Sequence, residues 1–207
     1  MDYRIEVIQD NIFAVIIPDR YDRCMTFLKV AEYYESPEFK GKHFTFWEFM
    51  RWYTEKNGTF SYVKDWEGAN VPLKVFRKFI NHGRWIETPY DYYLCDIWDR
   101  IDRHGLKNGY VIFTDSTQGE TFDHEMCHAK SYLDKNYKKL ASILVDKLPS
   151  HVYNPIKDSL LGVGYCEDVI VDEIQAYMTT NYWDLNTEGI EDVAKKFEET
   201  LGQYIKK

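Results

Sequence analysis

Two short runs of β-forming residues stand near the start of the chain. Residues 3–8 and 12–17 are rich in Ile, Val and aromatic side chains and are separated by Gln-Asp-Asn, a pattern that predicts a β-hairpin. A third run, Tyr-Val-Ile-Phe-Thr at 110–114, lies between a glycine and a polar loop and also predicts a strand. The segment 59–65 is expected to form a fourth, short strand.

Apolar residues at helical spacing occupy most of the remaining chain. Thr45-Phe-Trp-Glu48 is a capping box, in which the two polar side chains bond free backbone N–H groups at the start of a helix. This helix should end near Gly58, because glycine adopts the left-handed conformation of helix ends easily. Pro72 and Pro89 are expected in the first turns of two further helices. The predicted helices are 23–35, 45–58, 72–81, 89–103, 121–133, 136–147, 167–181 and 188–205.

The predicted helices clearly outnumber the strands, and Gly83 and Gly105 are expected to stop two of them. This balance indicates an α+β fold that is mainly helical. No repeat, low-complexity tract or linker interrupts the chain, so one compact unit with two lobes is expected. The N-terminal lobe, 1–105, would hold the hairpin and several helices, and the second lobe, 106–207, would begin with the strand 110–114.

Composition and charge argue against several classes of protein. Of the 207 residues, 44% are hydrophobic and 29% are charged, which is typical of a globular chain and not of a disordered one. The formal net charge of −8 argues against a general nucleic-acid binder, which needs a basic surface. No apolar stretch approaches the length of a membrane span, and residues 1–9 lack a signal-peptide core. Together with four widely spaced cysteines, expected to be reduced, these features predict a soluble cytoplasmic protein without membrane partners.

The segment His124-Glu-Met-Cys-His128 carries the clearest chemistry in the sequence. On a helix, residues i and i+4 share one face, so both imidazoles can reach a single metal ion. Glu125 is rotated by about 100° from this face and can hold a water molecule beside the ion. This HExxH pattern resembles the zincin group of zinc metallopeptidases, in which zinc lowers the pKa of the water and the glutamate takes its proton.

A zincin site needs a third protein ligand, and two residues compete for this role. Asp134 would correspond to the metzincin arrangement, but Ser131 replaces the glycine that turns the chain, so Asp134 should stay on a continuing helix. The segment Glu173-Ile-Gln-Ala176 resembles the glutamate helix of the gluzincins, where a small residue lets this helix approach the HExxH helix. The resemblance therefore implies zinc bound by His124, His128 and Glu173, with Glu125 as general base.

The gluzincin resemblance also implies roles for neighbouring residues. Tyr177 stands where many gluzincins place an acidic residue that steadies a ligand histidine, so Asp172 or Asp123 is expected to take that role. The candidates for stabilising an oxyanion are His151, Tyr153, Tyr165 and Tyr177. A zincin-like fold would place the strand before the HExxH helix, 110–114, at an edge of the sheet, where it could pair with an extended substrate. The N-terminal lobe would form one wall of the cleft.

Together these features predict a zinc-dependent metallopeptidase that acts on a peptide or protein substrate. Two alternatives remain open at this stage. One is a metal-dependent hydrolase of another amide or ester bond, because the motif does not define the scissile group. The other is a non-catalytic interaction protein in which the HExxH helix is a relic. The residues around the motif also resemble uncharacterised bacterial and phage HExxH proteins, and no motif indicates an oligomeric state.

Overall fold

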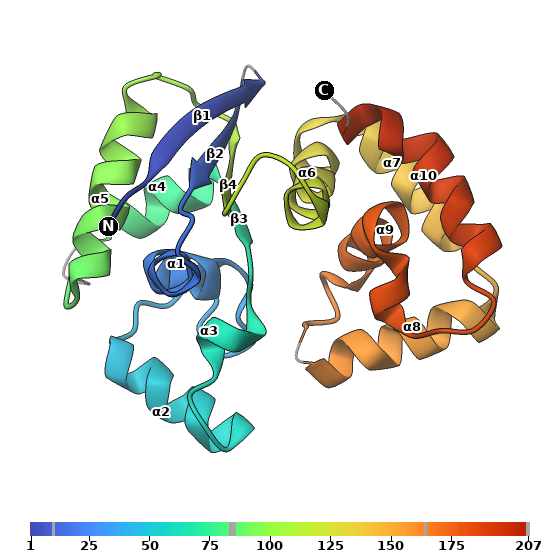
Figure 1. Cartoon of the computed structure of the whole chain (residues 1–207), viewed down its shortest axis with the longest axis horizontal. Helices are drawn as coiled ribbons and strands as arrows, with labels where there is room; N and C mark the ends of the chain where they lie inside the picture. Colours follow the sequence, from blue (N-terminus) through green and yellow to red (C-terminus); the bar gives the residue numbers. More distant parts are fainter. Residues whose placement is uncertain (10, 83–85, 164, 206–207) are drawn as a thin grey trace. The chain divides into compact units, whose positions relative to one another are not determined.

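The computed structural model describes residues 1–9, 11–82, 86–163 and 165–205. The chain divides into two compact units, Met1–Thr117 and Gln118–Lys207 (Figure 1). The strand at 110–114 thus belongs to the first unit, whereas the expected division at residue 105 grouped it with the HExxH helix. The predicted α+β class is confirmed, because 62% of the chain is helical and one small sheet is present. Among the described residues, no helix has the length and apolar character that a membrane crossing requires.

The first unit contains a four-stranded sheet in the order β1-β2-β4-β3. β1 (Arg4–Gln9) and β2 (Ile12–Ile16) form the predicted antiparallel hairpin. β4 (Tyr110–Thr114) pairs in parallel with β2 and antiparallel with β3 (Ala69–Pro72). The expectation that 110–114 is an edge strand is therefore wrong. Because both neighbours of β4 use its backbone hydrogen bonds, β4 cannot accept a substrate strand.

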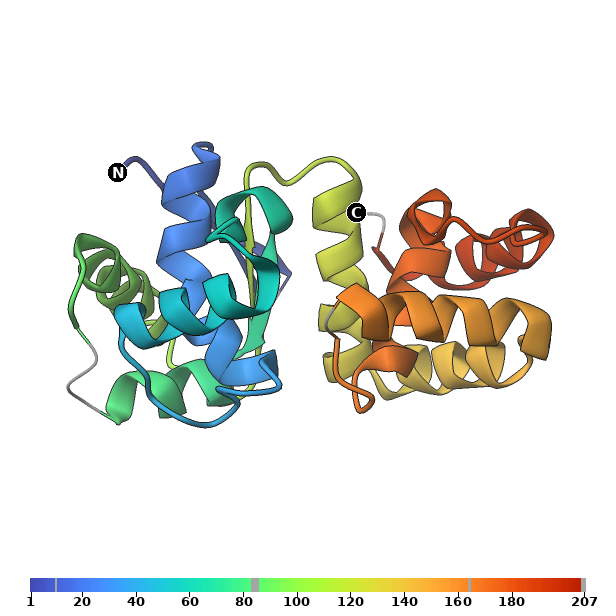
Figure 2. The same cartoon turned by 90° about the horizontal axis from the view of Figure 1, so that it is seen from below.

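Helices cover one face of this sheet. Figures 1 and 2 both show α1, α4 and α5 on the same side of the strands. Alternate residues of the two central strands, among them Phe13, Val15, Val111 and Phe113, are fully buried in the core that these helices share. The helices of this unit are α1 (Arg20–Glu35), α2 (Phe46–Asn57), α3 (Tyr62–Asp65), α4 (Leu73–Asn81) and α5 (Pro89–Asp102).

Local signals at the helix ends of the first unit are largely confirmed. Thr45 and Glu48 form the capping box of α2, and Gly58 ends this helix with a φ of 78°. Pro89 is the first residue of α5, and Gly105 follows that helix with a φ of 67°. Gly83, the expected stop of α4, lies outside the described residues. These ends depend on contacts within a few residues, which explains why the sequence predicts them.

The predicted strand at 59–65 is wrong, because this segment contains the short helix α3. Asp65 accepts hydrogen bonds from the hydroxyls of Ser61 (2.5 Å) and Tyr53 (2.6 Å), and the Ser61 bond spans one helical turn. The strand that β4 needs comes later, as β3. Pro72 is correspondingly the last residue of β3 and the N-cap of α4, one position before the expected first turn.

Glu32 on α1 is a buried carboxyl group of the first unit. It is 9% exposed, and burial raises its pKa from 4.5 to about 7, although hydrogen bonds with Ser36 and Tyr62 oppose this shift. Between pH 4.5 and about 7 the folded chain therefore binds this proton more tightly than the unfolded chain does. The contribution of Glu32 to stability is present below pH 4.5 and is lost as the pH rises to about 7.

We expect Glu32→Gln to stabilise the first unit at pH 8 by up to about 3 kcal/mol, with the gain disappearing near pH 4.5. Urea unfolding at several pH values measures the effect. Tryptophan fluorescence reports on this unit, since five of the six tryptophans (positions 47, 52, 66, 85 and 98) lie in it. The exposed Glu55 provides the control Glu55→Gln, which should show no such trend. A difference between wild type and Glu32→Gln that is constant with pH would contradict the assignment.

All regular secondary structure in the described residues of the second unit is helical. It consists of α6 (Glu120–Leu133), α7 (Lys135–Asp146), α8 (Ser150–Val163), α9 (Ile170–Thr180), the 3₁₀ helix η1 (Tyr182–Leu185) and α10 (Glu191–Ile205). The four helices predicted from residue 121 onward are confirmed with small shifts at their ends. The sequence pattern missed α8, because Pro155 lies inside it and proline normally breaks helices.

α9 lies at the centre of the second unit and packs against α6, α7, α8 and α10 (Figure 1). Residues on several sides of α9 are buried, including the polar Glu173 and Gln175. Ala176, the small residue expected to let α9 approach the HExxH helix, is fully buried, and α9 packs closely on α6. A buried carboxylate and a buried amide need partners, and these partners define the candidate site.

Candidate metal centre

α6 presents the HExxH histidines on one face. Gly119, with a φ of 104°, precedes the helix at a position that favours glycine. One helical turn apart, the rings of His124 and His128 have centroids 4.9 Å apart, and their Nε2 atoms are separated by 3.2 Å. The helix ends at Leu133, and Asp134 accepts backbone hydrogen bonds at the start of α7. Asp134 is thus a helix cap, and the expectation that it continues the helix is wrong.

The third ligand candidate, Glu173, reaches the two histidines from α9. Its Oε2 lies 3.6 Å from His124 Nε2, and its Oε1 lies 3.6 Å from His128 Nε2. His128 and Glu173 are buried, and the His124 side chain is 13% exposed. Among the described residues, this trio is the one group of three His, Cys, Asp or Glu side chains close enough to hold a metal ion together.

Hydrogen bonds fix which ring nitrogen of each histidine carries its proton. His128 Nδ1 lies 2.8 Å from Asp172 Oδ2, and an ionised carboxylate can only accept, so Nδ1 donates. Asn181 Nδ2 donates to Asp184 over 2.7 Å, which turns the Asn181 Oδ1 acceptor toward His124 Nδ1 at 3.2 Å. In their neutral forms, both histidines would therefore present the Nε2 lone pair to the space beside Glu173.

The site contains a buried, unpaired acceptor and several negative charges. Glu173 Oε2 is buried and has no hydrogen-bond partner. Burial alone would lower the pKa of His128, but Glu173, Asp172 and Glu125 together raise it well above its usual range. The negative charge around the two Nε2 atoms therefore favours a cation in this buried space, as a proton on His128 or as a bound metal ion.

The spacing of the three ligand atoms fits a tetrahedral ion. Bonds of about 2.1 Å to nitrogen and oxygen place neighbouring ligand atoms about 3.4 Å apart. The Nε2 atoms of His124 and His128 are 3.2 Å apart, and each lies 3.6 Å from a different oxygen of the Glu173 carboxylate. One ligand atom from each of the three residues can be chosen so that all lie within 4.8 Å of one another. The trio can therefore bind one ion with three protein ligands and leave a fourth position open.

Glu125 lies beside this centre on α6 and is 8% exposed. Its charge contributes to the raised pKa of His128, which places the carboxylate within electrostatic reach of that ring. Burial raises the pKa of Tyr177, and the charges of Glu173 and Glu125 add to this shift. The Tyr177 ring packs edge-on against His124, with centroids 4.7 Å apart. A carboxylate and a phenol thus lie close to the ligand trio.

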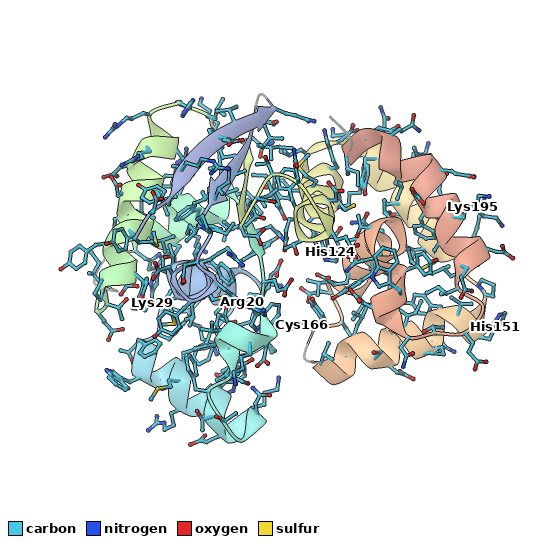
Figure 3. The ribbon with its side chains drawn as sticks, viewed as in Figure 1. Arg20, Lys29, His124, His151, Cys166 and Lys195 are labelled. Atoms are coloured by element: carbon cyan, nitrogen blue, oxygen red, sulfur yellow. The ribbon has the colours of Figure 1, made fainter. Side chains whose placement is uncertain are left out.

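Other predicted residues lie elsewhere. His151 is exposed on α8, and Figure 3 shows it far from His124 within the second unit, which excludes it as an oxyanion-stabilising residue. Tyr153 is also on α8 and is half-buried. Cys127 is fully buried, and burial raises its pKa to about 12. Of the two carboxylates expected to steady a histidine, Asp172 is the one that bonds His128.

Asn181 is the residue near the ligands that the sequence pattern did not indicate. It follows the last residue of α9 and reaches His124 across 57 positions of sequence. An asparagine at a helix end is common and ordinarily serves as a cap, so no local signal separates this residue from many others.

Comparison with known protein families, with curated proteins and with solved structures finds no match to this chain. The description of the site therefore depends on its own geometry.

Proposed function

We propose that this protein is a zinc-dependent metallopeptidase. The observation that carries the proposal is the convergence of His124 Nε2, His128 Nε2 and the Glu173 carboxylate within 3.2–3.6 Å, with the Nδ1 atom of each histidine directed at a hydrogen-bond acceptor. Two imidazoles and one carboxylate form a ligand set that catalytic zinc uses, with the fourth position left for water or substrate. The orphaned Glu173 Oε2 supports this assignment.

The chemistry that zinc supplies when bound is polarisation of a carbonyl group and a lowered pKa for water. Glu125 then acts as the base. It accepts a proton from the water as the water oxygen forms a bond to the peptide carbon, and it delivers this proton to the nitrogen as the C–N bond breaks. Glu125 is 8% exposed, and a site that excludes water strengthens the electrostatic interactions of such a carboxylate.

Removal and restoration of the metal test the proposal directly. Purified protein should contain close to one zinc ion per chain by elemental analysis, and it should cleave members of a diverse peptide library detected by mass spectrometry. A chelator should abolish cleavage, and added zinc should restore it. Protein treated with the chelator already saturated with zinc is the control for chelator effects unrelated to the metal.

Three results would contradict the proposal. Protein without near-stoichiometric zinc would exclude the metal site, and cleavage that persists after metal removal would exclude the mechanism. Zinc-loaded protein that hydrolyses ester or non-peptide amide substrates and leaves the peptide library intact would exclude a peptidase and favour the broader hydrolase class.

A further inference from the structure

A chain of hydrogen bonds extends from His128 to a third helix of the second unit. Tyr137 on α7 donates its hydroxyl to Gln175 Oε1 over 2.7 Å. Gln175 Nε2 donates to Asp172 Oδ1 over 3.3 Å, and Asp172 Oδ2 accepts from His128 Nδ1 over 2.8 Å. Each oxygen of the Asp172 carboxylate thus has a different partner, and both functional groups of the Gln175 amide are used.

Asp172 takes the role expected of a carboxylate that steadies a ligand histidine. We propose that Gln175 and Tyr137 are further positioning residues that act through Asp172 on the orientation and the metal affinity of His128, so that α7 takes part in the metal centre without contacting the ion. This inference rests on the proposed zinc site. Tyr137 is 0% exposed and Gln175 is 1% exposed. A buried hydroxyl or amide is costly unless it is hydrogen bonded, and the bonds described above satisfy both groups. None of the three atoms that would bind zinc belongs to this relay.

Consecutive residues of α9 contact opposite sides of the same imidazole. Asp172 bonds His128 Nδ1 at 2.8 Å, whereas Glu173 stays 3.6 Å from Nε2, a spacing that leaves room for an ion between them. Ser131 on α6 also hydrogen bonds to Asp172. The Asp172 carboxylate is therefore held by His128, Ser131 and Gln175 together.

The two ligand histidines differ in the charge of their partners. His128 faces a carboxylate, while His124 faces the neutral amide of Asn181. A charged acceptor increases the electron density at the metal-binding nitrogen more than a neutral acceptor does. His128 is therefore the histidine whose affinity depends most on its partner, and the relay to α7 stabilises that partner.

Zinc affinities of the full-length variants, measured by competition with a chromophoric chelator, test this inference. Asp172→Ala should lower the affinity about 10- to 100-fold. Asp172→Asn keeps an acceptor and should recover part of the loss. Tyr137→Phe deletes a single hydroxyl and should lower the affinity about 3- to 10-fold, the effect of one hydrogen bond. The controls are Asp158→Asn, at an exposed aspartate on α8, and Tyr204→Phe, at the tyrosine whose ring packs on Tyr137.

NMR separates positioning from a merely structural role. In the zinc-loaded wild type, the Nδ1 proton of His128 should give a downfield signal that exchanges slowly with solvent, and Tyr137→Phe should move this signal and speed its exchange. A zinc-binding wild type whose affinity and Nδ1 signal are unchanged by Tyr137→Phe would overturn the inference and leave the zinc site in place, whatever the effect of Asp172→Ala. A wild type that binds no zinc would overturn both.

Discussion

Glu125→Gln should reduce peptide hydrolysis by about 10²- to 10⁴-fold, the usual contribution of a positioned base. The amide has nearly the same shape as the carboxylate but cannot accept a proton from water. Because Glu125 is not one of the three ligand atoms that converge, the variant should keep its zinc. Cleavage of the best peptide from the library, measured beside elemental analysis on the same preparation, checks both parts of this expectation.

Glu120 provides the matched control for this experiment. It lies on the same helix as Glu125 and is exposed, so Glu120→Gln makes an identical chemical change away from the ligands. The control should hydrolyse the peptide at the wild-type rate. A zinc-loaded Glu125→Gln protein that cleaves as fast as Glu120→Gln would exclude the proposed mechanism, because no proton acceptor of this kind would then be needed.

Glu173→Ala should lower zinc affinity by more than about 100-fold. Loss of a hydrogen-bond partner of a ligand typically costs 10- to 100-fold, and loss of a ligand itself removes a direct bond and the negative charge that balances the ion. Titration of metal-free protein with zinc against a competing chelator measures the change. Zinc should also raise the melting temperature of the wild type much more than that of the variant, because an ion stabilises only the fold that binds it.

The control for Glu173→Ala is Glu188→Ala, at an exposed glutamate of the same unit. Glu188→Ala should bind zinc as the wild type does. Zinc content that stays the same in Glu173→Ala would show that the third ligand has been wrongly assigned, even if the two histidines bind the metal. In that case the close approach of Glu173 to both Nε2 atoms would have no role in metal binding.

The elements that the sequence predicts correctly are those defined by neighbouring residues. The hairpin of β1 and β2, the capping box of α2 and the strand β4 follow from β-rich runs or from cap residues a few positions apart. Where short-range signals mislead, prediction fails. The helix α8 was missed because Pro155 lies inside it and proline normally breaks helices. Aromatic residues before Asp65 indicated a strand where a short helix forms.

The residues of the candidate metal centre also differ in whether the sequence predicts them. The i, i+4 pair His124 and His128 follows from helix geometry, since both residues lie on one helix. Glu173 was reached only through a resemblance of its short segment to a known ligand helix. Neither helix geometry nor this resemblance identifies the residues that hydrogen bond to the two histidines. Asp172 was one of two candidates, and Asn181 was not a candidate at all.

The sequence by itself determined the α+β class, the capping of individual helices and the pair of histidines on α6. These features depend on propensities and spacings within one or two helical turns. Only the tertiary structure placed β4 between two strands, carried Glu173 to the histidines and joined His128 through Asp172 and Gln175 to Tyr137. The hydrogen bonds of Tyr137 with Gln175, of His128 with Asp172 and of His124 with Asn181 span 38 to 57 residues. Long-range contacts of this kind depend on how buried surfaces fit, and no local pattern encodes that fit.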